Sequence, residues 1–298
     1  MHILFLINEQ KQKKINQIKK YFLIDVTKQN HFFSFQIFND KNREKVFNNS
    51  LKTKSNKIIV IDEYDNFAFM FFSKQVDYFC ANPYNAKLAK LAIMHNNANV
   101  LAIGYKTICW FKIKKIISNF LYSLFEGGRH LARLENLHNS FESTTHKNNF
   151  DFTNHNDSII IACDHAGLNL KNQIFSYLTS KHFHLIDVGT YSNMSCNYST
   201  YGIKLGQTML KDGQKGIVIC GSGMGICNTI NKFYYLRCIN AYCKPQLLNA
   251  LQYDINVLGF GGRFISFNKA KKLIDIFLKQ KMNNKDNCLK HCGLELKK

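Results

Sequence analysis

The feature of this sequence that most constrains its fold is an internal repeat. Four segments of the first half recur in the second half, in the same order and displaced by 156 to 162 residues. Residues 2–8 match 158–164, 22–27 match 184–190, 56–62 match 215–220, and 97–104 match 254–261. Self-similarity over such a period indicates two copies of one domain-sized unit joined in tandem.

Within each copy, short apolar runs alternate with amphipathic stretches. Residues 170–183 place Leu170, Ile174 and Leu178 at helical spacing, and 106–125 form a longer stretch of the same kind. Strands that alternate with helices predict a parallel sheet covered by helices on both faces. We therefore expect an α/β fold made of two tandem Rossmann-like domains.

A polar segment without periodicity, 138–157, separates the two copies. We interpret it as a linker, because neither a helix nor a strand pattern continues through it. The expected organisation is a first domain at 1–138, a linker at 139–157 and a second domain at 158–298. A chain of 298 residues is long enough for each domain to bury its own core.

The formal net charge of +20 does not by itself indicate a nucleic-acid partner. Only five of the 40 basic residues are arginine, and lysine, asparagine and isoleucine are abundant, as expected of an A/T-rich coding sequence. No helix-turn-helix or aromatic-plus-basic motif is present, so we expect no specific nucleic acid as partner. No run approaches the ~20 apolar residues of a membrane helix. We expect a cytoplasmic protein with no membrane partner.

The 10 cysteines show no C-x-x-C pair. Their spacing favours free thiols in a reducing compartment over disulfides or a metal site.

The strongest chemical signal is at 215–232, where an apolar run ends at Cys220 and glycines follow at alternate positions. A P-loop would need a lysine after its last glycine, and a dinucleotide-binding loop would need a glycine where Ile226 stands. Backbone N–H groups of such a loop can converge on an anion at a helix N-terminus. We expect this field to lower the pKa of Cys220 and to make its thiol a base or nucleophile. A buried cysteine beside a packing turn is the alternative.

Two further polar residues, Asp164 and His165, end the first strand of the second copy. Ligands of α/β folds bind at this edge of the sheet, although an aspartate here can also cap the following helix. The aligned positions differ between the copies: the first copy carries Asn8, Glu9 and Asp62 where the second carries Asp164, His165 and Cys220. The first copy therefore lacks the thiol.

The first half carries residues that the second half lacks. His95 and Asn96 align with Gln252 and Tyr253. Arg129 and Arg133 lie one helical turn apart, which is suitable for holding a phosphate. Most basic residues of this chain are lysine, yet four of its five arginines fall in the repeat motifs: Arg129, Arg133, Arg237 and Arg263. Lysine does not reproduce the bidentate geometry of an arginine side chain.

Four motifs taken together, "ACDHAG", "ICGSGMG…INK", "HNNANVL" and "EGGRH", resemble the ribose-5-phosphate isomerase B and galactose-6-phosphate isomerase superfamily. The first half looks like the A subunit of heteromeric galactose-6-phosphate isomerase and the second half like the B subunit, as if the two were fused. Two departures are present: "DHAG" is closer to the ribose-5-phosphate branch, and "NYS" stands at 197–199 where relatives have "DYP".

This resemblance implies an aldose–ketose isomerase that acts through an enediolate without metal or cofactor. It also implies sites built across an intrachain pseudo-dimer of the two domains, which could dimerise further to a four-domain assembly. The implied roles are a base (Cys220), stabilisation of the enediolate oxygen (Ser222 and the backbone N–H groups of Gly221, Gly223 and Gly225), ring opening (His95, with Asn96 beside it), phosphate binding (Arg129, Arg133, His165) and sugar contacts (Asp164, Tyr198).

The expected ligand is a phosphorylated sugar. The first expectation is conversion of D-galactose 6-phosphate to D-tagatose 6-phosphate, and the alternative is conversion of ribose 5-phosphate to ribulose 5-phosphate. A third hypothesis is a non-catalytic sugar-phosphate-binding protein. Because only one copy carries the thiol, we expect one working site per chain.

Overall fold

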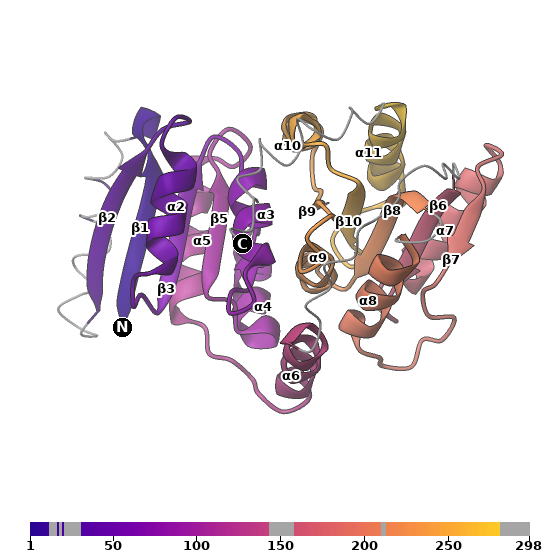
Figure 1. Cartoon of the computed structure of the whole chain (residues 1–298), viewed down its shortest axis with the longest axis horizontal. Coiled ribbons are helices and arrows are strands. Elements are labelled where there is room, and N and C mark those ends of the chain that lie inside the picture. Colours follow the sequence, from indigo (N-terminus) through magenta and orange to yellow (C-terminus); the bar gives the residue numbers. More distant parts are fainter. Residues whose placement is uncertain (12–16, 18–19, 21–30, 143–157, 210–212, 281–298) are drawn as a thin grey trace. The chain divides into compact units, whose positions relative to one another are not determined.

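The structure is a computed structural model that describes residues 1–11, 17, 20, 31–142, 158–209 and 213–280. Contacts divide the chain into two compact units, Met1–Phe72 with Tyr78–Phe125 and Ser73–Asp77 with Glu126–Lys298. Each unit is built on one five-stranded sheet with helices packed against it (Figure 1). The expected tandem α/β architecture is therefore confirmed. In the described part of the chain, no helix is both long and apolar enough to cross a membrane.

The sheet of the first unit has the strand order β2-β1-β3-β5-β4, and every neighbouring pair is parallel. Its strands are β1 (His2–Asn8), β2 (Phe32–Phe38), β3 (Lys57–Asp62), β4 (Cys80–Ala81) and β5 (Val100–Gly104). Its helices are η1 (Glu9–Lys11), α2 (Arg43–Leu51), α3 (Asn66–Lys74, whose end passes the unit division), α4 (Ala86–Asn96) and α5 (Trp110–Tyr122).

The second sheet repeats this topology as β7-β6-β8-β10-β9, again with parallel pairs. Its strands are β6 (Ser158–Cys163), β7 (Leu185–Asp187), β8 (Gly213–Cys220), β9 (Cys238–Asn240) and β10 (Val257–Gly261). Its helices are α6 (Arg129–Glu142), α7 (Leu168–Thr179), α8 (Tyr198–Met209), α9 (Met224–Asn231), α10 (Lys244–Ala250), η2 (Leu251–Tyr253) and α11 (Phe267–Lys279). Helices α8 and α9 contact each other and the sheet, and α7 and α11 do the same.

Strand register confirms the alignment of the two copies at the position that matters most. Asp62 ends β3 opposite Gly104, and Cys220 ends β8 opposite Gly261. The two residues are therefore equivalent in the fold. The repeat differs at the outer strand: the place of β7 is taken in the first unit by β2 at Phe32–Phe38, whereas the matched segment 22–27 lies outside the described residues.

Helix α6 differs from the expected domain boundary. It continues to Glu142, so the first residues of the expected linker 139–157 are helical, and residues 143–157 lie outside the described part. This helix groups with the second unit rather than with the first. Its contact with α8 and the edge-to-face packing of Phe141 on Phe233, with ring centroids 5.0 Å apart, account for this grouping.

A half-buried lysine performs the same structural task in both units. Lys57 of β3 donates to the carbonyl of Phe120 at the end of α5 (2.7 Å). Lys215 of β8 donates to the carbonyls of Phe277 (2.9 Å) and Gln280 (2.7 Å) at the end of α11. The last carbonyls of a helix have no partner within it and carry partial negative charge, so a cation stabilises them. Burial lowers the pKa of Lys57 to about 8.

Candidate active site

The candidate site of the second unit begins at the junction of β8 and α9. Only Gly221, Ser222 and Gly223 separate Cys220 from the first helical residue. Gly223 has a φ of 83°, and a Cβ there would come within 2.1 Å of Asn240 Oδ1, so the position requires glycine. The Gly223 N–H donates to Cys220 Sγ over 3.2 Å. The turn thus fixes the thiol beneath the N-terminus of α9.

The other two glycines of this loop have different surroundings. A Cβ on Gly225 would stand 2.9 Å from ring carbons of Tyr198, so this glycine allows the tyrosine to pack against α9. A Cβ on Gly221 would make only ordinary contact, 3.4 Å from Ala166 Cβ. The role of the Gly221, Gly223 and Gly225 N–H groups as donors to the enediolate oxygen stays a prediction, and in this structure the Gly223 N–H donates to the Cys220 sulfur.

The expected low pKa of Cys220 is wrong. The residue is 3% exposed, and burial raises the pKa of its thiol to about 12, with a further increase from the negative charge of Asp164. The N–H groups of Ile226 and Gly223 lower this pKa by less. Loss of hydration at the foot of the loop therefore outweighs the field of the helix N-terminus.

Asp164 and Tyr198 bring two polar groups close to this thiol. Asp164 is 5% exposed, and its Oδ1 accepts from the N–H groups of Ala166 (2.9 Å) and Gly167 (3.1 Å). These two bonds close the turn before α7, whose N-cap is Gly167 and which has no side-chain cap hydrogen bond, so the helix-capping alternative is not what the structure shows. Asp164 Oδ2 bonds to no described residue. Burial raises the pKa of Asp164, and His165 is the strongest opposing influence. The buried Tyr198 hydroxyl has no hydrogen-bond partner among the described residues.

His165 and Arg133 meet at one loop residue, Cys196, in the connection from β7 to α8. The Cys196 N–H donates to His165 Nδ1 (3.2 Å), and Arg133 Nη2 donates to the Cys196 carbonyl (3.4 Å) and to Ser195 Oγ (3.3 Å). Arg129, by contrast, is exposed at the start of α6. Sequence reasoning missed Cys196, because nothing local marks a contact between residues 31 positions apart.

The predicted ring-opening pair belongs to the first unit. His95 and Asn96 are the last two residues of α4, which ends at Asn97 with a φ of 46°. The equivalent end of η2 is Asp254, with a φ of 48°, which agrees with the alignment of the copies. The combination of this pair with Cys220 in one site stays a prediction.

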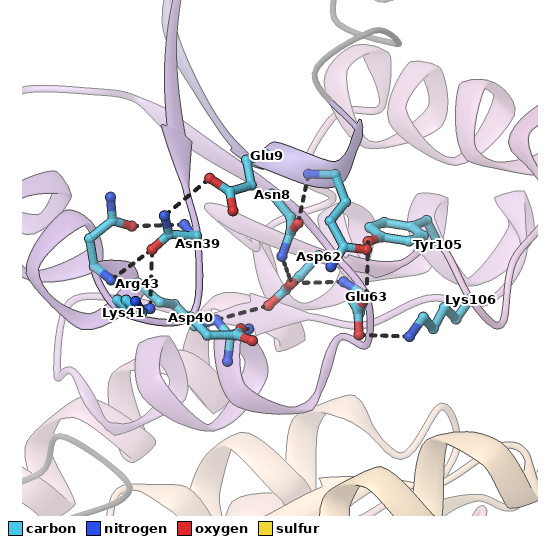
Figure 2. Close-up of polar contacts among 12 residues, drawn as sticks. Asn8, Glu9, Asn39, Asp40, Lys41, Arg43, Asp62, Glu63, Tyr105 and Lys106 are labelled. Carbon is cyan, nitrogen blue, oxygen red and sulfur yellow. Dashed lines mark hydrogen bonds and ion pairs between the residues drawn. The ribbon is translucent and has the colours of Figure 1, made fainter.

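The equivalent edge of the first unit is occupied by an ion pair (Figure 2). Asp62, which is 2% exposed, accepts at Oδ1 from Asn8 Nδ2 (2.9 Å) and from the Glu63 N–H (2.7 Å). Its Oδ2 lies 3.2 Å from Arg43 Nε, and the Arg43 guanidinium stands 5.3 Å from the centroid of the Phe67 ring. The carboxylate that replaces the thiol is therefore held from three sides.

Not all arginines of the repeat motifs serve a site. Arg237 Nε donates to the carbonyls of Asp254 (2.7 Å) and Tyr253 (3.1 Å), so its task is to hold the turn after η2. Arg263 is exposed, and its guanidinium carbon lies 3.7 Å from where a Cβ of Gly221 would stand. Arginine at position 237 therefore has a structural cause, and anion binding by the other arginines of these motifs stays a prediction.

Fold and site together define a tandem-domain α/β enzyme with a buried thiol at the carboxyl edge of one sheet. The model of the Ribose/Galactose Isomerase family matches the chain twice, over residues 6–137 and 159–291. The chain therefore belongs to the ribose/galactose isomerase family, and it is a sugar-phosphate isomerase of that family.

Relatives of two kinds are similar to this chain. Ribose-5-phosphate isomerase B of Escherichia coli is 35% identical over 126 residues, which are 40% of this chain and 82% of that protein. Galactose-6-phosphate isomerase subunit LacB of Clostridium acetobutylicum is 32% identical over 125 residues, 41% of this chain and 72% of that protein. Among solved structures, ribose-5-phosphate isomerase B of Mycoplasma genitalium with bound ribulose-5-phosphate is 29% identical to this chain, with a TM-score of 0.41. The match covers 46% of this chain and 91% of that protein.

Proposed function

We propose that this isomerase interconverts an aldose phosphate and a ketose phosphate through an enediolate, with Cys220 as the base. The observation that carries the proposal is the position of the thiol, at the carboxyl edge of a parallel sheet with Asp164 and the unpartnered Tyr198 hydroxyl nearby. Ligands of such folds bind at this edge. A buried hydroxyl without a partner costs free energy unless a ligand completes it.

The proposed reaction moves one proton between adjacent carbons of the open-chain sugar. The Cys220 thiolate removes the proton from the carbon next to the carbonyl, and the electron pair moves to the carbonyl oxygen to give the enediolate. The Cys220 thiol then returns the proton to the former carbonyl carbon, while a hydroxyl proton passes between the two oxygens. We assign stabilisation of the negative oxygen to Ser222 and to the loop N–H groups of Gly221 and Gly225.

A thiol with a pKa of about 12 is a strong base that is rarely ionised at neutral pH. The proposed rate therefore follows the thiolate fraction and rises with pH. The binding groups are assigned separately: Arg133 and His165, joined by Arg129, hold the phosphate, and Asp164 contacts sugar hydroxyls.

We further propose that the ring-opening step is supplied by His95, with Asn96 beside it, so that the complete site combines both units. The occupied edge of the first unit supports this division, because Asp62 is held by two hydrogen-bond donors and an ion pair with Arg43, and this position has no thiol. One working site per chain follows. Titration with an enediolate-mimicking inhibitor should give one equivalent per chain, and two equivalents would contradict the proposal.

As substrate we propose D-galactose 6-phosphate, converted to D-tagatose 6-phosphate. The presence of a thiol in only one unit supports it, as expected of an A-type and a B-type subunit in one chain. Ribose 5-phosphate is the second candidate, favoured by the similarity to proteins named ribose-5-phosphate isomerase B. Steady-state turnover of both sugars by the full chain separates the two.

The thiol assignment is tested with Cys220→Ala and with Cys243→Ala as the matched control, because Cys243 lies at the N-terminus of α10. Loss of a general base should lower kcat by about 10²–10⁴-fold. The control should keep wild-type turnover. Full turnover by Cys220→Ala would overturn the assignment, and binding of sugar phosphates by the wild-type chain without turnover would favour a non-catalytic binding protein.

A further inference from the structure

Cys196 forms hydrogen bonds with both His165 and Arg133, two residues of the proposed phosphate site that belong to the second unit. It lies in the connection between Asp187, the end of β7, and Tyr198, the start of α8. It is half-buried and has a free thiol. Its three hydrogen-bonding groups, N–H, carbonyl and sulfur, all take part in contacts with these two residues.

The contact with His165 decides the state of the imidazole. A backbone N–H can only donate, so His165 Nδ1 must accept the bond from the Cys196 N–H at 3.2 Å. A neutral ring whose Nδ1 accepts carries its proton on Nε2. His165 Nε2 makes no hydrogen bond to the described part of the chain, so this N–H is available to an acceptor such as a phosphate oxygen.

The contact is reciprocal, which fixes the backbone as well as the ring. The His165 N–H donates to Cys196 Sγ over 3.2 Å, and the same sulfur lies 3.7 Å from His165 Nδ1. The short segment after β6 and the loop before α8 are thus joined by two bonds that run in opposite directions. Rotation of the imidazole would break one of them.

The contact with Arg133 uses the remaining group of Cys196. Arg133 Nη2 reaches the Cys196 carbonyl at 3.4 Å and the neighbouring Ser195 Oγ at 3.3 Å. These bonds are long, and they engage one terminal nitrogen only. The other guanidinium nitrogens of Arg133 bond to no described residue, so the cation is oriented while most of its donors stay available.

We infer that Cys196 is a positioning residue for phosphate binding: it holds His165 as the Nε2–H tautomer and orients Arg133 toward the same anion. The inference rests on the proposed function only in naming the phosphate as the anion. Cys196 touches no reacting atom in this scheme, so its replacement should weaken binding and leave the chemical step nearly unchanged.

The tautomer is tested on the free full chain, without substrate. In protein labelled with 15N-histidine, the His165 signals are assigned by their loss in His165→Gln. We expect an unprotonated Nδ1 and a protonated Nε2 in the wild type and in Cys196→Ala, because alanine keeps the backbone N–H that donates to Nδ1. Cys196→Pro removes this N–H and should give a mixture of tautomers. Cys243→Ala should leave the wild-type pattern. A protonated Nδ1 in the neutral wild-type ring would overturn the inference.

Binding is tested with inorganic phosphate and with both sugar phosphates. Cys196→Ala leaves the His165 N–H without its acceptor, and loss of one neutral hydrogen bond corresponds to about a fivefold rise in Kd and KM. We expect kcat to stay within about twofold, and Cys196→Ser, which keeps an acceptor, to recover part of the affinity.

The proposed function and the positioning role of Cys196 are tested by different measurements. If the chain turns over neither sugar, the proposed substrates are wrong, but the tautomer and the phosphate Kd still decide the role of Cys196. If His165→Ala weakens phosphate binding while Cys196→Ala leaves the phosphate Kd unchanged and Cys196→Pro leaves the tautomer unchanged, the positioning role is wrong and the site stands.

Discussion

Removal of one partner of the Arg43–Asp62 pair should strongly destabilise the first unit. Asp62 lies under the sheet edge with a side chain 3% exposed, and the side chain of Arg43 is 14% exposed. Removal of one partner of a buried pair leaves a charge without compensation and costs about 3–5 kcal/mol. Because Asn8 and the Glu63 N–H remain bonded to Asp62, the loss of unfolding free energy in Arg43→Met should lie at the lower end of this range, at about 3 kcal/mol.

The pH dependence of this penalty has a defined sign. Burial raises the pKa of Asp62 above 3.8, and Arg43 is the strongest opposing influence. A carboxyl with a raised pKa binds more protons in the folded state, so its contribution to stability falls as the pH rises through the interval between the two pKa values. Loss of Arg43 raises the folded pKa further. The penalty of Arg43→Met should therefore be largest near neutral pH and smaller in mild acid.

The chain offers a selective probe for this experiment. Its single tryptophan, Trp110, begins α5 of the first unit, so fluorescence during urea unfolding reports on that unit. A double-mutant cycle with Asp62→Asn should give a coupling of about 1–3 kcal/mol. Lys45→Met, which removes an exposed cation from the same helix, should stay within about 0.5 kcal/mol of wild type. Additive effects, or an Arg43→Met variant as stable as the Lys45→Met control, would refute the reasoning.

Three other predictions follow from the geometry. Because burial raises the pKa of Cys220 to about 12, the rate of its alkylation by iodoacetamide, measured by mass spectrometry, should rise about tenfold per pH unit between about pH 7 and 9. A plateau of this rate in that range would contradict the raised pKa. Gly225→Ala should cost about 1–3 kcal/mol in denaturant unfolding because the new methyl group meets the Tyr198 ring, whereas Gly221→Ala should be tolerated; equal effects would show that the contact does not decide. Lys57→Met should destabilise the first unit by about 1 kcal/mol, because it removes the hydrogen bond from Lys57 to the end of α5. The folded-state pKa of Lys57, about 8, lies below the usual 10.5, so the stability of the wild type relative to this variant should increase from pH 8 to 10.5. A decrease over this interval would contradict the prediction.

Local and periodic features of this fold were predictable from the sequence. Apolar strands separated by amphipathic helices, together with the tandem repeat, led to the two parallel sheets and to the equivalence of Asp62 and Cys220. The outer strand β2 was not predicted, because the sequence match assigned the counterpart of β7 to residues 22–27, whereas the strand that occupies this place is Phe32–Phe38.

The electrostatic part of the site was less accessible to sequence reasoning. Burial raises the pKa of Cys220, whereas the N–H groups at the helix N-terminus lower it. Which effect is larger depends on the depth and orientation of the thiol, and these follow only from the three-dimensional structure. The contact of Cys196 with His165 joins two loops through backbone groups, which no residue pattern encodes. Asp164, by contrast, was placed correctly at the strand end because the edge of a parallel sheet follows from strand order alone.

The turn that holds Cys220 bears on whether the first copy could regain the chemistry of the second. In the second unit the sulfur needs a glycine with positive φ three residues later, whose N–H reaches it. The residues after Asp62 are Glu63, Tyr64 and Asp65, and none of them has a positive φ. A cysteine at position 62 would therefore provide the sulfur without the turn that holds it, and Arg43 would lose its ion-pair partner Asp62. A thiol held in this way in the first unit therefore needs several coordinated substitutions, so the difference between the two copies at this position is hard to remove one mutation at a time.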